Sequence, residues 1–224
     1  MSEFGRGVLR PDEHAARVDL TRHEPGPAVS RFVEYYWLVR WHVDEPYDSR
    51  ILSHPNVHLA FESGGPLVYG VDRGLFVRRL EGSGQALGVK FRPGGFRPFA
   101  HGSVTGLTDR RVAAADFFGP GILEVNEAVL AALAEEFLAP RLPSDPDPLF
   151  ENVAAMVGRM LTEPTGFRVD EAAAALHLST RTLQRLFAEY VGVSPKWVLR
   201  RARLQKAATR ADRGDTIDWA ALAA

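Results

Sequence analysis

The sequence predicts an α+β protein in which an antiparallel β-barrel or sandwich with flanking helices precedes an all-helical domain. Residues 33–91 alternate between apolar and polar side chains and are interrupted by glycine-containing turns, which is typical of short strands. From residue 149 onward, apolar residues recur with helical spacing instead. A stretch with four prolines lies between the two patterns, at Pro140, Pro143, Pro146 and Pro148. We therefore predict a β-rich domain at 1–139, a stiff linker at 140–148 and a helical domain at 149–224.

Composition restricts the class of protein. The hydrophobic fraction of 46% and the charged fraction of 25% are those of an ordinary globular chain. Cysteine is absent, which excludes disulfides, thiol nucleophiles and cysteine-ligated zinc. The sequence contains neither an apolar run of about 18 residues nor an N-terminal secretory signal. We therefore expect a cytoplasmic protein that does not span a membrane.

The strands and flanking helices follow from local patterns. The clearest strand runs from Val33 to Val43, where apolar and polar residues alternate strictly, and residues 1–25 form an irregular arm or a short edge strand. Shorter strands are predicted at 50–53, 57–63, 67–72, 75–80 and 85–91, with turns at 64–66, 72–74 and 82–84. Helices are predicted at Leu107–Phe118, Gly121–Leu138 and Leu149–Leu161. Short strands joined by hairpins favour a barrel or a sandwich.

The segment Val169–Val193 reads as two short helices joined by a tight turn. The second helix begins after Ser179, a favourable N-cap residue, and has an apolar stripe along one face. Its other face carries Arg181, Gln184 and Arg185. Arginine can pair with guanine O6 and N7 and glutamine with adenine N6 and N7, so we expect these three side chains to contact base edges. The alternative is that they only make the helix soluble.

Charge is distributed unevenly along the chain. Residues 164–214 hold ten Lys and Arg against four acids, a balance of +6, whereas the whole chain carries −1 and the remainder therefore −7. A basic segment on an acidic chain is the expected footprint of nucleic-acid binding at one end, although a solvated helical face would look similar. The candidates for phosphate contact are Ser179, Thr180, Lys196, Arg200, Arg201 and Lys206.

The stretch VDEAAAALHLSTRTLQRLFAEYVGVSPKWVLRRARLQKAA resembles the first helix-turn-helix and the connecting helix of AraC/XylS transcription regulators. His177 occupies a turn position where that family often has glycine. The tryptophan-containing first strand, LGVKFRPGGFRPF and LTDRR resemble a sensor region of some members. The resemblance implies a DNA-binding regulator with a small-molecule effector, and dimerisation through the strand domain.

Members of this family carry two helix-turn-helix units that enter successive major grooves. Ile217–Ala224 resembles only the beginning of the second unit, so the sequence looks truncated. We expect weak or non-specific DNA binding, because each good bidentate base contact discriminates by about 1–3 kcal/mol.

Six aromatic residues face inward by strand parity: Tyr35, Trp37, Trp41, Phe61, Tyr69 and Phe91. A small barrel lined by them could hold an apolar or aromatic effector. The alternatives are that they fill an ordinary core, or that the domain serves only in dimerisation.

Metal binding and catalysis find little support. A barrel of this kind is similar to the metal-binding cupins, and His54, His58 and Glu62 resemble ligands, but His58 and Glu62 fall on the outward parity. The chain has no G-x-S-x-G, P-loop or G-x-G-x-x-G motif. We therefore expect no metal, no cofactor and no enzymatic activity. The alternative function is a small-molecule-binding or enzymatic β-barrel with a helical appendage that does not contact DNA.

Overall fold

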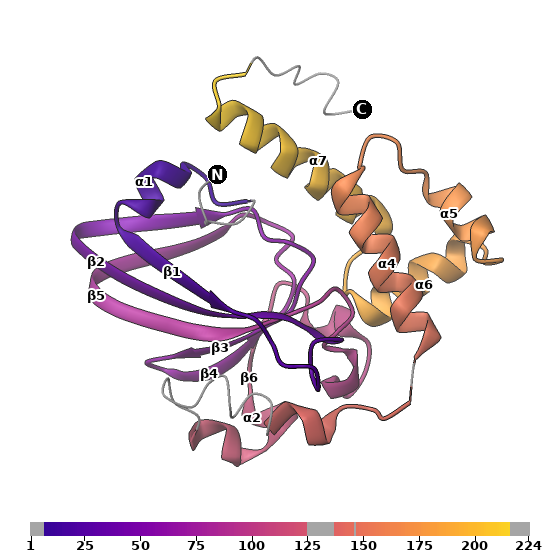
Figure 1. The fold of residues 1–224 in the computed structure, drawn as a ribbon, viewed down its shortest axis with the longest axis horizontal. Coiled ribbons are helices and arrows are strands. Elements are labelled where there is room, and N and C mark those ends of the chain that lie inside the picture. The colour runs from indigo at the N-terminus through magenta and orange to yellow at the C-terminus, as the bar shows by residue number, and fades with distance from the viewer. Residues whose placement is uncertain (1–6, 125–136, 146, 216–224) are drawn as a thin grey trace.

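The protein consists of an antiparallel sheet joined to a group of helices (Figure 1). The computed structural model describes residues 7–124, 137–145 and 147–215. Its strands are β1 (Val18–His23), β2 (Val33–Ile51), β3 (His58–Glu62), β4 (Gly65–Tyr69), β5 (Phe76–Phe91) and β6 (Arg111–Ala113). Its α-helices are α1 (Pro11–Ala15), α2 (Ala115–Phe118), α4 (Pro148–Thr162), α5 (Val169–Ala175), α6 (Thr180–Tyr190) and α7 (Pro195–Asp212). Its 3-10 helices are η1 (Arg97–Phe99), η2 (Val104–Leu107), η3 (Pro120–Glu124) and η5 (Ala139–Arg141).

The six strands form one sheet in the order β1-β2-β5-β3-β4-β6. Every pair of neighbouring strands is antiparallel, which confirms the α+β class. The short edge strand expected within residues 1–25 is β1. The sheet has two edges, β1 and β6, so it is not closed into a barrel. The long β2–β5 ribbon has a register shift between Val43 and Tyr47 and curves strongly, as such irregularities promote (Figure 1).

Three predicted boundaries were wrong. The turn expected at 64–66 ends earlier, because Gly65 and Pro66 belong to β4 and pair with β3. Residues 82–84 form no turn, because β2 continues opposite them and pairs Val43 with Gly82 and Trp41 with Gly84. Leu107–Phe118 is not one helix, because β4 provides backbone partners that draw Arg111–Ala113 into the sheet as β6. Most of the helix expected at Gly121–Leu138 lies outside the described residues.

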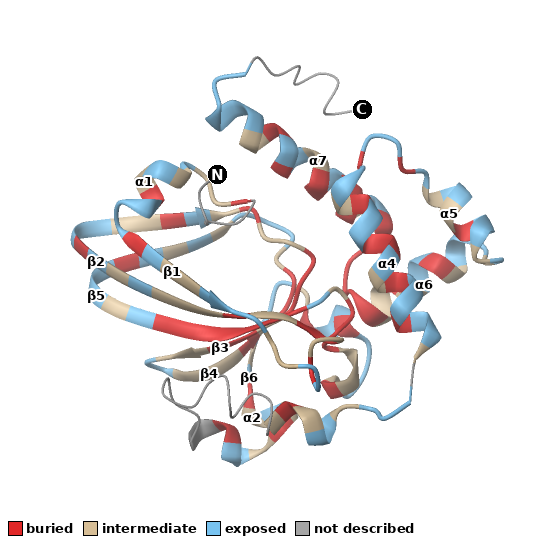
Figure 2. Ribbon diagram, in the orientation of Figure 1, coloured by how far each residue is buried: buried red, intermediate tan, exposed pale blue. Residues whose placement is uncertain are grey.

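Apolar side chains form two large clusters. The first covers one face of the sheet, called here the core face, and includes Val89, Phe91 and Phe96. The second lies among α4–α7, called here the helical region, and also takes in Phe32 and Val71 from the sheet region. Buried residues are concentrated where the strands meet the helices (Figure 2). The predicted domains therefore share part of a core, although their boundaries remain predictions.

Candidate nucleic-acid interface and ligand cavity

The turn between α5 and α6 sets the angle of the candidate recognition helix. After α5, the amide of Leu178 donates to the carbonyl of Ala173 at 2.9 Å, a helix-ending bond that requires a left-handed residue between them. His177 provides it with a φ of 55°. Ser179 then caps α6, and its Oγ accepts the amide hydrogen of Thr182 at 3.1 Å.

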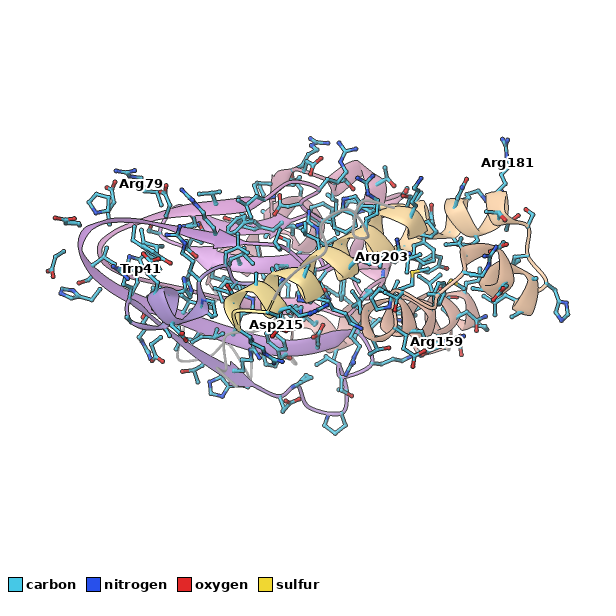
Figure 3. All side chains as sticks on the ribbon, turned by 90° about the horizontal axis from the view of Figure 1, so that it is seen from above. Trp41, Arg79, Arg159, Arg181, Arg203 and Asp215 are labelled. Atoms are coloured by element: carbon cyan, nitrogen blue, oxygen red, sulfur yellow. The ribbon has the colours of Figure 1, made fainter. Side chains whose placement is uncertain are left out.

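Helix α6 has one buried and one exposed face. Leu183 and Phe187 are completely buried in the helical region. The three predicted base-reading residues are all exposed on the other side: Arg181, Gln184 and Arg185. In Figure 3, Arg181 projects away from the body of the protein. This face is therefore open to a partner in the described structure.

The candidate phosphate-binding residues fall into two groups. Five of them are exposed: Ser179, Thr180, Lys196, Arg200 and Lys206. Lys206 also donates from Nζ to the carbonyl of Thr162 at 2.5 Å. The expectation for Arg201 was wrong, because this side chain is buried and its Nη2 donates to the carbonyls of Arg73 at 2.6 Å and Gly74 at 2.9 Å.

Sequence reasoning also missed Gln205, one helical turn after Arg201 on α7. Gln205 is buried, and its Nε2 donates to the carbonyl of Leu52 at 2.7 Å. Both polar residues lie on the face of α7 that buries Val198 and Ala202. Polar side chains at positions i and i+4 within an apolar stripe are a sequence signal for such buried contacts.

The comparisons agree with this geometry. Residues 172–224 match the family model "Helix-turn-helix domain", and residues 21–113 match "Domain of unknown function (DUF6597)". This is the domain order of an AraC/XylS family regulator. The helix-turn-helix match makes the chain a DNA-binding transcription regulator. Neither a curated protein nor a solved structure matches it.

The sheet region holds the candidate recognition helix, α6, through hydroxyl groups. Ser103 and Thr105 donate to the carbonyl of Ala188 at 2.9 and 2.8 Å, and Thr108 donates to that of Gly192 at 2.7 Å. Ala188 lies in the last turn of α6, whose carbonyls lack partners within the helix, so its two bonds satisfy a group that would otherwise need water. Gly192 follows the end of this helix.

The glycine-rich motif after β5 contributes to the same contact. Arg97 Nε donates to Glu189 at 2.7 Å. Gly94 has a φ of 84° and lies against Phe150 and Tyr190, where a side chain would be both strained and crowded. The RPGG and LTDR segments, which resemble sensor motifs in the sequence, therefore attach the helix-turn-helix to the sheet.

A cavity of about 270 Å³ lies on the other face of the sheet, called here the cavity face. Tyr35, Trp37, Trp41 and Tyr69 line it as predicted residues of the effector pocket. Phe91 belongs to the core-face cluster and Phe61 packs against it, so the prediction was wrong for these two.

Strand register explains both exceptions. Leu87 of β5 pairs with Leu38 of β2 and with Phe61 of β3, so these three side chains share the core face. Trp37 pairs with Gly88, an even-numbered residue of β5. From Tyr35 onward, the odd-numbered residues of β2 therefore lie on the face opposite that of the odd-numbered residues of β5 and β3. Parity within one strand cannot show which face its neighbour shares.

Two glycines make room for the tryptophans of the cavity. A methyl group added at Gly88 would overlap the indole of Trp37 and the carbonyl oxygen of Leu59. A methyl group added at Gly84 would overlap the indole of Trp41. The two indoles therefore lie directly against the backbone of β5, and their rings form part of the cavity wall.

The polar end of the cavity is internally paired. Arg78 Nη1 lies 2.6 Å from Glu62 Oε2, and the Tyr69 hydroxyl donates to Glu62 at 2.6 Å. Burial and this carboxylate raise the pKa of Tyr69 to about 12. Lys90 Nζ lies 3.0 Å from Glu34.

His58 and Glu62 also line the cavity, although parity had placed them outward. Burial, together with the charge of Lys90, lowers the pKa of His58 to about 3, so its imidazole is neutral at physiological pH. No group of His, Asp or Glu among the described residues is arranged to hold a metal ion. Within the same residues, no helix is long and apolar enough to cross a membrane.

Proposed function

We propose that this regulator reads DNA sequence with α6 and that a small apolar or aromatic molecule in the cavity modulates it. The observation that carries the proposal is the division of α6 into two faces. Leu183 and Phe187 on its apolar side are fully buried, while the opposite side exposes Arg181, Gln184 and Arg185. A helix fixed in this way can enter a major groove with its polar face toward the bases.

Each polar group has an assigned role. Arg181 and Arg185 pair with guanine and Gln184 pairs with adenine. The exposed hydroxyls of Ser179 and Thr180, at the N-terminus of α6, contact phosphate oxygens. Three basic residues add phosphate contacts along α7: Lys196, Arg200 and Lys206. Phosphate contacts release counterions, so the affinity should fall steeply as salt increases.

The test is selection of a bound site from a random DNA library, followed by fluorescence-anisotropy titration of that site. Both steps are done at low salt, which strengthens the weak binding expected of this chain. Arg181→Ala and Gln184→Ala should each weaken binding and relax discrimination at one base position by about 1–3 kcal/mol. Arg79→Ala is the matched control, because Arg79 is an exposed arginine at the opposite end of the molecule (Figure 3). Equal effects of Arg79→Ala and Arg181→Ala would contradict base reading by α6.

The cavity supports a second candidate, a small-molecule-binding or enzymatic protein whose helical region does not contact DNA. The two candidates differ in one measurement, since only the first predicts that a cavity ligand changes the DNA affinity. A regulator acts on the chromosome, so we place the protein in the cytoplasm. Pairing of two copies through the sheet region remains a prediction, which light scattering can test.

A further inference from the structure

We propose that the cavity selects an uncharged aromatic molecule of one or two fused rings that carries a hydrogen-bond acceptor such as a carbonyl oxygen. This inference rests on the proposed effector role and specifies the chemistry of the effector. Three features of the cavity support it: its size and walls, the pairing of its charges, and an indole donor without an acceptor.

The size and walls of the cavity favour a small flat molecule. Its volume of about 270 Å³ is slightly below the range of about 300–1,000 Å³ that is usual for ligand pockets. Its apolar lining includes Trp37, Trp41, Val39 and Leu80. The indoles lie close to the glycines of β5 and offer broad ring surfaces, which aromatic ligands contact in offset or edge-on arrangements.

The charged groups around the cavity already have partners in the protein. Arg78 is paired with Glu62, and Lys90 with Glu34. Asp72 lies 2.9 Å from Arg111. A charged ligand would lose its hydration on entering the cavity and would find no free counter-charge in these pairs. Its transfer from water into the cavity is therefore strongly unfavourable.

The remaining ionisable groups of the cavity reinforce this selectivity. Arg22 also lines the cavity and keeps its positive charge, but the side chain is exposed and water screens that charge. Its guanidinium lies 4.7 Å from the ring centroid of Tyr35. Burial lowers the pKa of His14 and of His58, so both imidazoles are uncharged at neutral pH. A neutral ligand is therefore favoured over an anion and over a cation alike.

The indole of Trp37 supplies the hydrogen-bonding preference. Its Nε1 has no acceptor among the described residues and is covered by neighbouring protein atoms, while other atoms of Trp37 line the cavity. The ring centroid of the neutral His58 is 6.3 Å from that of Trp37. Buried donors are rarely left without a partner, and a modest shift of the indole toward a ligand oxygen would pair this one.

The experiment compares four two-ring probes by calorimetry and thermal shift on the full chain. The probes are 1-tetralone, tetralin, 2-naphthoate and 1-naphthylmethylammonium. We expect 1-tetralone to bind at least tenfold more tightly than either charged probe, and more tightly than tetralin. Trp37→Phe should remove the preference for 1-tetralone over tetralin while retaining tetralin binding. Trp197→Phe is the control, since Trp197 packs in the helical region.

The outcomes separate this inference from the proposed function. Tighter binding of 2-naphthoate or of the ammonium probe would overturn the inference but leave the effector role standing. Absence of binding by all four probes would overturn the inference and remove the support for the effector role. DNA reading by α6 would be unaffected, because the Arg181→Ala titration tests it separately. An unchanged preference in Trp37→Phe, with an unchanged melting temperature, would contradict the role of the indole donor.

Discussion

His177 is a non-glycine residue in the left-handed region, and its backbone shapes the turn before α6. Its φ of 55° costs an L-residue about 1–2 kcal/mol, which glycine avoids. Glycine in turn makes the unfolded chain more flexible, which offsets part of the gain. We expect His177→Gly to stabilise the protein by up to about 1 kcal/mol in urea unfolding. His177→Ala, which keeps the Cβ atom, should give no gain; equal stabilisation by both variants would contradict this account.

His58 in the cavity makes the stability of the folded protein depend on pH. Its pKa is about 3 in the folded protein, against an ordinary value of 6.5. Between these values the unfolded chain binds the additional proton, so stability falls as the pH decreases through this window, by at most about 1.4 kcal/mol per pH unit. Above 6.5 the imidazole is neutral in both states and contributes no slope.

The measurement is urea unfolding between pH 7 and pH 4.5. His58→Gln cannot take up the proton, so its stability should decline less steeply with acid than that of the natural chain. An identical slope in both proteins would show that His58 does not carry this effect. His14 is present in both proteins and keeps its own contribution, since burial lowers its pKa also.

Helix α7 has one exposed and one buried face. Arg200 is exposed and Arg201 is buried against the loop between β4 and β5. Arg201→Ala should lower stability by about 1.5–3 kcal/mol, because two carbonyls lose a charged donor. Arg200→Ala should change stability by less than about 0.5 kcal/mol and reduce the salt dependence of DNA binding by about one ion. Chemical unfolding and salt-dependent anisotropy measure both effects; reversed effects of the neighbouring substitutions would contradict the assignment.

The whole molecule is held together by contacts that cross between the sheet and helical regions. Phe32 stacks on Phe150 with ring centroids 5.1 Å apart. The hydroxyls of η2 and its flanks bind the end of α6, and Arg201 and Gln205 bind loops of the sheet. We therefore expect the two regions to unfold in a single cooperative transition.

This cooperativity can be measured in a Trp197→Phe/Trp219→Phe variant, whose fluorescence reports on Trp37 and Trp41 alone. Its fluorescence and its far-UV circular dichroism, which is dominated by the helices, should give the same melting temperature. Two separate transitions would show that the helical region unfolds independently of the sheet.

The features that were predictable from sequence depend on neighbours along the chain. The caps and apolar stripe of α6 involve residues within one or two helical turns, and the structure has Ser179 as the cap and Leu183 in the core. The alternation in β2 likewise identified Trp37 and Trp41 as residues of one face. The prediction of a turn at residues 82–84 was wrong because the conformation there depends on a residue range distant in sequence. The strand β2 continues opposite residues 82–84 and keeps them in β5.

The sequence by itself determined the α+β class, the helix-turn-helix and its exposed Arg and Gln face, because helical periodicity and capping are local. Only the tertiary structure decided which sheet face carries the cavity, since register between distant strands separates Phe61 from Trp37. It also decided that Arg201 is structural, because its carbonyl partners lie 127 and 128 positions away in the chain. An arginine that contacts a phosphate and an arginine that makes a buried structural contact look the same in the sequence. Only the three-dimensional surroundings of the side chain distinguish these two roles.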